Sequence, residues 1–116
     1  MANRRLFSKS VIYSDSFEGL PGDALKLYVY MMLEADDDGF LGHTKKVVRM
    51  AGANQEIFDM LKARGLIYEF KSGVCVIAHW RKQNSIDRQG YTPTEFTVER
   101  SLVYLDENVY YPNIDL

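Results

Sequence analysis

The sequence predicts an α+β fold that is mostly helical, a winged helix-turn-helix with a short β-hairpin wing and an extra C-terminal helix. Three observations support this. Apolar residues recur at helical spacing over 44–52 and 54–65, which predicts two short helices in succession. Two apolar runs follow, over 66–70 and 74–80, and the Lys-Ser-Gly between them predicts a hairpin. An earlier helix is predicted over 21–34. A helix-turn-helix followed by a hairpin is the winged-helix pattern, which often presents a helix to DNA. The same scaffold also serves protein contacts, so fold alone does not determine function.

The length of 116 residues fits a single domain. We divide it into a winged-helix domain over 1–94 and a C-terminal helix and tail over 95–116, which is part of the same domain or leads to a further C-terminal domain. The single cysteine, Cys75, excludes a disulfide within the chain and suits a cytoplasmic protein. We recognise no signal peptide and no apolar run of the ~18 residues that span a membrane, so no membrane partner is expected.

The charge distribution is more informative than the net charge of −2, which by itself argues against strong DNA binding. Residues 43–88 contain nine Lys and Arg against four Asp and Glu, whereas both flanking segments are acidic. The basic stretch coincides with the predicted helix-turn-helix and hairpin, which indicates nucleic-acid binding. The alternative is that these charges form an ordinary solvated surface, and the charge distribution alone does not distinguish the two.

The segment 21–34 is the clearest helix. Pro21 suits its first turn, and Asp23 suits the positive end of the helix dipole. One apolar stripe at helical spacing is expected to face the core and consists of Leu25, Tyr28, Val29, Met32 and Leu33.

A second apolar face of this helix is formed by Leu27, Tyr30 and Met31. A surface helix of a monomer does not need a second apolar face, so either the N-terminal segment or another subunit covers it. We favour another subunit and expect a homo-oligomer. Before this helix, Arg4 and Arg5 form either a basic arm that reaches a phosphate or a solvated end of the chain.

The acidic run Asp36-Asp37-Asp38 follows the helix, where carboxylates face the negative end of the dipole. A calcium loop of the EF-hand type is rejected because Lys45 occupies the position of the bidentate glutamate. We interpret the run as a turn that leads into a short strand at 40–41 and bonds to nearby Lys or Arg, with a metal site as a distant alternative.

Local signals set the ends of the two helices that follow. Thr44 is expected to cap the first of them and Gly52 to end it, while Asn54 caps the second and Gly65 ends it. Gly73 supplies a positive φ in the tight loop of the hairpin.

The strongest candidate for DNA contact is the start of the first of these helices. Lys45 and Lys46 lie where the dipole disfavours cations but where free N–H groups and ammonium groups attract a phosphate, and Arg49 follows one turn later. On the second helix, Gln55 is expected to read adenine and Lys62 to reach a phosphate or guanine. Glu56 and Asp59 lie on the same face of this helix and repel the DNA backbone. The sequence therefore favours phosphate contact over base readout by this helix. The full candidate set is Lys45, Lys46, Arg49, Gln55, Lys62, Lys71, Arg81, Lys82 and Arg88.

Towards the C-terminus, Trp80 alternates with Val74 and Val76 as the end of a strand and is expected to pack in the core, and His79 is read as structural. A capping box over 92–95 predicts a helix that continues to about residue 106, and the apolar end over 109–112 is expected to dock on the domain.

Four segments in order resemble the N-terminal domain of phage replisome-organiser proteins, replication initiators related to the DnaD-like primosome proteins. They read Asn3-Arg4-Arg5-Leu6-Phe7-Ser8-Lys9-Ser10, Ala35-Asp36-Asp37-Asp38-Gly39-Phe40, His79-Trp80-Arg81-Lys82-Gln83-Asn84 and Tyr91-Thr92-Pro93-Thr94. The resemblance implies a self-associating winged-helix domain that acts at double-stranded origin DNA in the cytoplasm of a bacterial host. It also implies recruitment of the replicative helicase or its loader, which family members achieve with a further C-terminal part.

Two other functions remain open: a winged-helix module for oligomerisation or protein contacts with little DNA binding, and a winged-helix transcriptional regulator. An enzyme is not expected, because the sequence has no Gly-rich phosphate loop, no metal-ligand spacing and no Ser/His/Asp arrangement that its spacing supports. No catalytic residue, metal or cofactor is therefore assigned.

Overall fold

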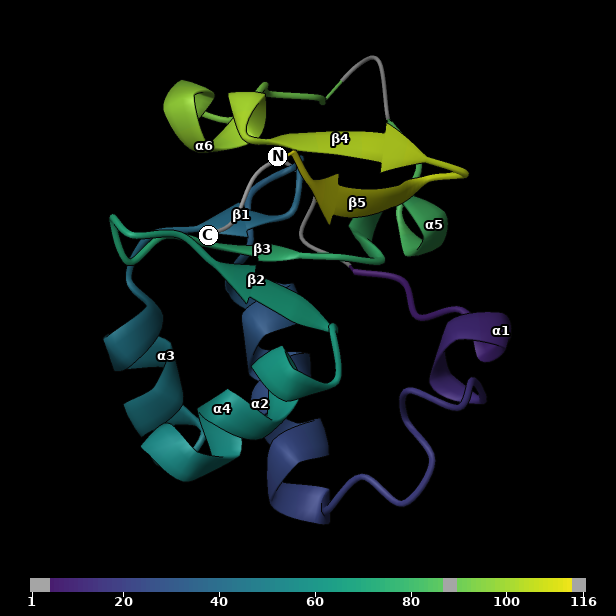
Figure 1. Cartoon of the computed structure of the whole chain (residues 1–116), viewed down its shortest axis with the longest axis vertical. Coiled ribbons are helices and arrows are strands. Elements are labelled where there is room, and N and C mark those ends of the chain that lie inside the picture. Colours follow the sequence, from purple (N-terminus) through teal and green to yellow (C-terminus); the bar gives the residue numbers. More distant parts are fainter. Residues whose placement is uncertain (1–4, 87–89, 114–116) are drawn as a thin grey trace.

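The computed structural model describes residues 5–86 and 90–113. In chain order its elements are α1 (Lys9–Ile12), α2 (Gly22–Glu34), β1 (Phe40–Leu41), α3 (Thr44–Met50), α4 (Gln55–Ala63), β2 (Ile67–Glu69), β3 (Cys75–Ile77), α5 (Trp80–Gln83), α6 (Thr97–Ser101), β4 (Val103–Asp106) and β5 (Val109–Pro112). The fold is α+β in three layers (Figure 1). Helices α2, α3 and α4 lie on one side of an antiparallel sheet with strand order β1–β3–β2, and the β4–β5 hairpin with α6 lies on the other side.

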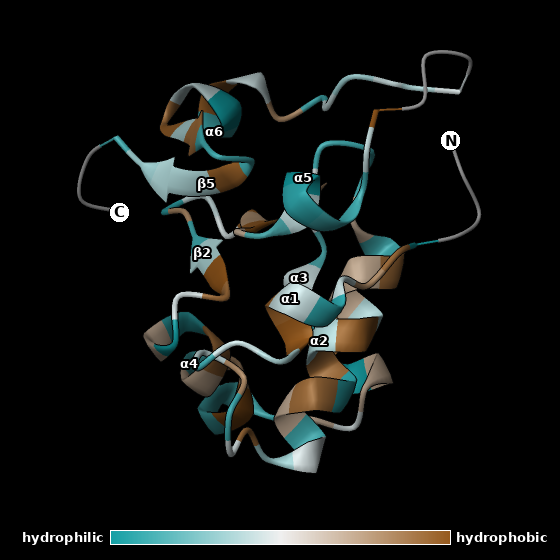
Figure 2. Cartoon of the chain, turned by 90° about the vertical axis from the view of Figure 1, so that its right-hand side faces the viewer, coloured by the Kyte–Doolittle hydropathy of each residue, from teal (hydrophilic) through white to brown (hydrophobic). Residues whose placement is uncertain are grey.

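Helix α2 forms where the sequence predicts it, but its core-facing side is rotated from the predicted stripe. Tyr28 and Met32 are completely buried as predicted, and so are Leu27 and Met31, whereas Leu25 and Leu33 are 39% and 52% exposed. Helices α3 and α4 both pack against α2. Hydrophobic residues run along most of α2 (Figure 2), so the pattern alone left the orientation ambiguous. The prediction that Leu27 and Met31 form a self-association surface is wrong, and Tyr30 is half-buried against the core.

The turn between α3 and α4 and the end of α4 follow their local signals. Gly52 and Gly65 adopt positive φ angles of 68° and 70°, and the Asn54 side chain accepts a hydrogen bond from the Ile57 N–H at 2.9 Å. Thr44, in contrast, does not cap α3, because it lies inside the first turn and its hydroxyl donates to the Gly73 carbonyl at 3.1 Å. That bond ties the start of α3 to the loop of the β2–β3 hairpin.

The predicted strand over 74–80 is shorter than expected, because β3 ends at Ile77 and Trp80 opens α5. Trp80 is nevertheless in the core, 1% exposed, and its indole N–H donates to the Asp37 carbonyl at 2.9 Å. The ring lies against Gly39, which has φ 92° and where a Cβ would stand 2.5 Å from Trp80 Cγ. Only glycine fits this turn without displacing the tryptophan.

The long C-terminal helix predicted from the capping box is wrong. Residues 92–96 are not helical; α6 has five residues, and a hairpin of β4 and β5 follows, turning at Glu107 and Asn108 with φ 49° and 64°. Thr92, the expected N-cap, donates its N–H to Asp37 Oδ2 at 2.9 Å, and the Thr94 N–H and hydroxyl donate to Asp38 and Asp36 at 2.8 and 2.6 Å, which holds this segment against the acidic turn. The apolar end does dock as predicted, with Tyr110 only 1% exposed. One core cluster includes residues of this hairpin, so the described part of the chain forms a single domain.

The acidic turn 36–38 links the chain segments that lie around it. Asp38 accepts hydrogen bonds from Arg81 at 2.6 Å and from the Tyr91 hydroxyl at 2.8 Å, in addition to Thr94. The Tyr110 hydroxyl donates to the Asp38 carbonyl at 2.8 Å. Burial raises the pKa of the neighbouring Asp36 carboxyl above its ordinary value. The expected turn with basic partners and a following strand is thus confirmed.

The N-terminal segment is held against the same region. Arg5 donates to the Ala35 carbonyl at 2.8 Å, lies 5.1 Å from the centre of the Trp80 ring, and has a side chain only 4% exposed. The Asn84 side chain accepts the Leu6 N–H at 2.9 Å. Both expectations, a basic arm and a solvated end of the chain, are therefore wrong for Arg5, and Arg4 lies outside the described residues.

Candidate nucleic-acid interface

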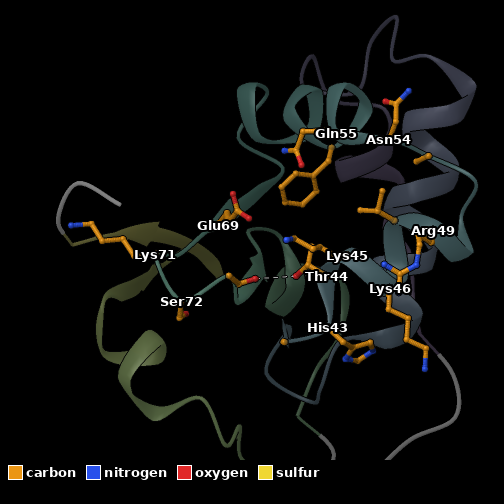
Figure 3. Close-up of a pocket in the computed structure, with 15 residues that line it drawn as sticks. His43, Thr44, Lys45, Lys46, Arg49, Asn54, Gln55, Glu69, Lys71 and Ser72 are labelled. Atoms are coloured by element: carbon orange, nitrogen blue, oxygen red, sulfur yellow. Dashed lines mark hydrogen bonds between the residues drawn. The ribbon is translucent and has the colours of Figure 1, made fainter.

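A groove of about 660 Å³ lies between α3, the start of α4 and the loop of the β2–β3 hairpin (Figure 3). Five residues predicted to contact DNA line it: Lys45, Lys46, Arg49, Gln55 and Lys71. They come from three separate stretches of the chain, and the fold brings them together. The groove is the part of the predicted interface that the structure assembles.

The charges in this groove are mostly positive. Among the described residues that line it, all four Lys and Arg residues are exposed, and Glu69 is the one carboxylate. Figure 3 shows Lys45 reaching into the groove towards Glu69, Lys46 and Arg49 along one side, and Lys71 on the hairpin loop across from them. A hollow with an excess of one sign of charge concentrates the opposite charge, so this groove attracts anions.

The local structure explains why these cations point outward. Val47 is completely buried and fixes the inner side of α3, which leaves Lys45 and Lys46 in solvent. The bond from Thr44 to Gly73 holds the hairpin loop beside α3. Because α3 has only seven residues, we attribute the attraction for phosphate to the side chains and not to the helix dipole.

The outer face of α4 is less available than the sequence suggests. Lys62 Nζ lies 2.8 Å from Glu69 Oε1 and 3.9 Å from Asp59 Oδ1. The hydrogen bond to Glu69 is the main cause of a raised pKa for Lys62. Gln55 donates its amide to Asp59 at 2.8 Å, so reading a base with Gln55 would require breaking that bond.

The remaining predicted contacts lie elsewhere. Arg81 is not a phosphate contact, because it is paired with Asp38 at 2.6 Å and both side chains are only 9% exposed. Lys82 is exposed on α5 and is not among the residues that line the groove. Arg88 lies outside the described residues.

Sequence reasoning missed several polar residues of the groove, which are His43, Thr44, Asn54, Glu69 and Ser72. For Glu69 the alternation of side chains along β2 was an available signal, because it places Glu69 on the same face of the strand as Ile67, the face turned towards the protein, where a carboxylate is unusual. Ser72 gave no such signal; its hydroxyl donates to Glu99 of α6 at 2.7 Å across 27 residues.

The positive surface ends at β1. A neighbouring hollow of about 430 Å³ shares Gly42 and His43 with the groove but contains the carboxylates Glu34 and Asp36. The sign of the charge therefore changes there.

Three further features of the described residues bear on other kinds of site. No group of three or more His, Cys, Asp or Glu side chains within residues 5–86 and 90–113 is arranged to hold a metal ion. Cys75 is buried, and burial raises the pKa of its thiol to about 12. Among the helices described, none is both long and apolar enough for a membrane span.

Comparison with known protein families, curated proteins and solved structures finds no match to this chain.

Proposed function

We propose that this chain is a winged helix-turn-helix domain that binds DNA through phosphate contacts in the groove. The order helix, strand, helix, helix and hairpin, with sheet order β1–β3–β2, is typical of a winged helix and supports this assignment. In that arrangement α3 and α4 form the helix-turn-helix and the β2–β3 loop forms the wing.

One observation carries the proposal. Lys45, Lys46 and Arg49 on α3 and Lys71 on the hairpin loop line one groove with a single carboxylate beside them. A patch of exposed cations assembled from separate parts of the chain is the electrostatic footprint of a phosphate-binding surface. The rest of the chain is acidic, so this concentration of positive charge is local to the groove.

The binding we propose depends on salt and little on base sequence. Four cations that neutralise four phosphates give a slope of about −3 to −4 for the logarithm of the association constant against the logarithm of salt concentration. Glu56 and Asp59 on the outer face of α4 disfavour close approach to the bases, and Gln55 is already bonded to Asp59.

The biological role we propose is that of a phage or prophage replication initiator, in the manner of the replisome organisers. It rests on the resemblance alone. The segments that carry the resemblance do meet around the acidic turn, where Arg5, Asp38 and Arg81 are buried beside Trp80. Binding of phage origin fragments in preference to unrelated duplexes of equal length is the measurement that separates an initiator from a general DNA-binding module.

The test of DNA binding is fluorescence anisotropy of a labelled 20-base-pair duplex, chosen as roughly two turns of DNA, at two salt concentrations. Reversing two charges in Lys45→Glu with Lys46→Glu should weaken binding at least about tenfold whatever the duplex sequence. The matched control is Lys9→Glu with Lys26→Glu, which changes the net charge equally at exposed sites outside the groove. Equal losses in both double variants would overturn the proposal.

Self-association is the second candidate, and exposed apolar residues on α2 favour it. Leu25 and Leu33 are 39% and 52% exposed, so they, and not Leu27 or Met31, are the residues that a second copy would cover. Light scattering at increasing concentration tests this. An oligomer that Leu25→Asp with Leu33→Asp converts to a folded monomer would support it, and a wild type that stays monomeric would reject it.

A further inference from the structure

Lys62 and Glu69 form an ion pair at the edge of the groove. Lys62 Nζ lies 2.8 Å from Glu69 Oε1, and the two side chains are 36% and 32% exposed. The ammonium also lies 5.5 Å from the centre of the Phe58 ring, which lines the groove. Lys62 thus does not line the groove itself but is paired with the one carboxylate among the described residues that line it.

Glu69 is unfavourable for a phosphate-binding groove when it is left alone. It faces Lys45 (Figure 3), so an unpaired carboxylate there would compete with a phosphate for that ammonium and repel the phosphate directly. The pair with Lys62 restrains the carboxylate and offsets its charge.

A polar chain extends this arrangement along α4. Gln55, which lines the groove, donates to Asp59 at 2.8 Å, and Asp59 lies 3.9 Å from Lys62. Lys62 therefore stands between two carboxylates, Asp59 and Glu69. Its single positive charge offsets part of their combined charge, at a place where α4 otherwise presents acid to an incoming phosphate chain.

We propose that Lys62 is a positioning residue of the groove, which raises its affinity for phosphate by neutralising and holding Glu69 without touching the nucleic acid itself. This inference rests on the proposed DNA binding. It assigns the sequence-predicted contact Lys62 an indirect role and makes Glu69 the residue through which it acts.

A double-mutant cycle with Lys62→Gln and Glu69→Gln tests this, read out as affinity for the labelled 20-base-pair duplex used above. Lys62→Gln alone should weaken binding about 2- to 5-fold, the range for a partly exposed ion pair. Glu69→Gln alone should strengthen binding, and the double variant should bind like Glu69→Gln. Lys62→Arg, which keeps the positive charge, should preserve most of the affinity.

A different pattern would overturn the inference. If Lys62 contacts phosphate directly, Lys62→Gln weakens binding equally with and without Glu69 and lowers the salt slope by about 1. No change in either background also rejects it. Melting temperatures of all four proteins show whether folding is affected, and Lys26→Gln, an exposed lysine outside the groove, is the matched control.

The two proposals fail in different ways. If the wild type does not bind the duplex even at low salt, the proposed function fails and this inference with it. If the wild type binds and reversing Lys45 and Lys46 abolishes binding, but the effects of Lys62→Gln and Glu69→Gln are additive, only the indirect role of Lys62 is wrong.

Discussion

Replacing Asp38 by alanine should destabilise the fold more than any surface substitution. Its carboxylate accepts from Arg81 at 2.6 Å, from the Tyr91 hydroxyl and from the Thr94 N–H at 2.8 Å, and the Arg81 side chain is only 9% exposed. The substitution leaves a buried guanidinium without its counter-charge and removes the acceptor of two further donors.

The expected loss follows from these contacts. Removing one partner of a buried ion pair costs about 3–5 kcal/mol, a large share of the ~5–15 kcal/mol by which a domain is stable. For a domain of this size the melting temperature should fall by roughly 10–20 °C. The exposed carboxylate Asp15 provides the control, since Asp15→Ala should change the stability by no more than about 0.5 kcal/mol.

Thermal and urea unfolding followed by circular dichroism measure both variants. Adding Arg81→Leu to Asp38→Ala should recover part of the loss, because no buried charge then remains unpaired. A fall of less than about 3 °C for Asp38→Ala, or a double variant that is no more stable than the single one, would refute this account of the acidic turn.

Three further predictions concern single positions. Gly39→Ala should lower the stability by about 2–4 kcal/mol in urea unfolding, because φ is 92° there and the new Cβ would lie 2.5 Å from Trp80 Cγ, whereas Gly22→Ala, with open space around it, should be nearly neutral. Burial and the charge of Lys82 lower the pKa of His79 below its ordinary 6.5, so the unfolded chain binds a proton at His79 more readily than the folded chain does. The stability that neutral His79 contributes is therefore complete above pH 6.5 and is lost as the pH falls below it. The variant His79→Gln should reduce this pH dependence in urea titrations from about pH 7 to about pH 5. The Cys75 thiol, with its pKa raised to about 12, should react with a thiol reagent only as fast as the protein unfolds, and fast labelling of the native protein would contradict its burial.

Local signals predicted α3, α4 and the turn between them, apart from the cap at Thr44. Asn54, Gly52 and Gly65 act through a bond to a near neighbour or through their own φ angles, so a short stretch of sequence contains the information, whereas Thr44 bonds to Gly73, 29 residues away. The orientation of α2 could not be predicted this way, because apolar residues surround most of the helix and α3 and α4 decide which side is buried. The capping box failed for a related reason: bonds from Thr92 and Thr94 to the acidic turn, more than 50 residues away, override the local preference.

The sequence predicted part of the candidate groove, because local spacing along the chain determines where some of its cations lie. Lys45, Lys46 and Arg49 share one short helix, so their proximity follows from helical spacing, and Lys71 is exposed at the tip of a hairpin. What the sequence did not reveal is which cations are already paired. Arg81 is matched by an aspartate 43 residues earlier, and Lys62 by a glutamate on a neighbouring strand, and only the folded chain shows these partners.

The bond between Ser72 and Glu99 has a consequence for how the groove meets its ligand. One wall of the groove is a short loop that would lose conformational freedom on binding, and the bond to Glu99 of α6 already restrains that loop. The Phe96 ring lies against Gly42, another residue that lines the groove. A surface ordered in advance loses less entropy when it binds a phosphate chain. If the groove binds DNA as proposed, the C-terminal segment, whose described residues carry none of the groove's cations, would add to the affinity by keeping the loop in its binding shape.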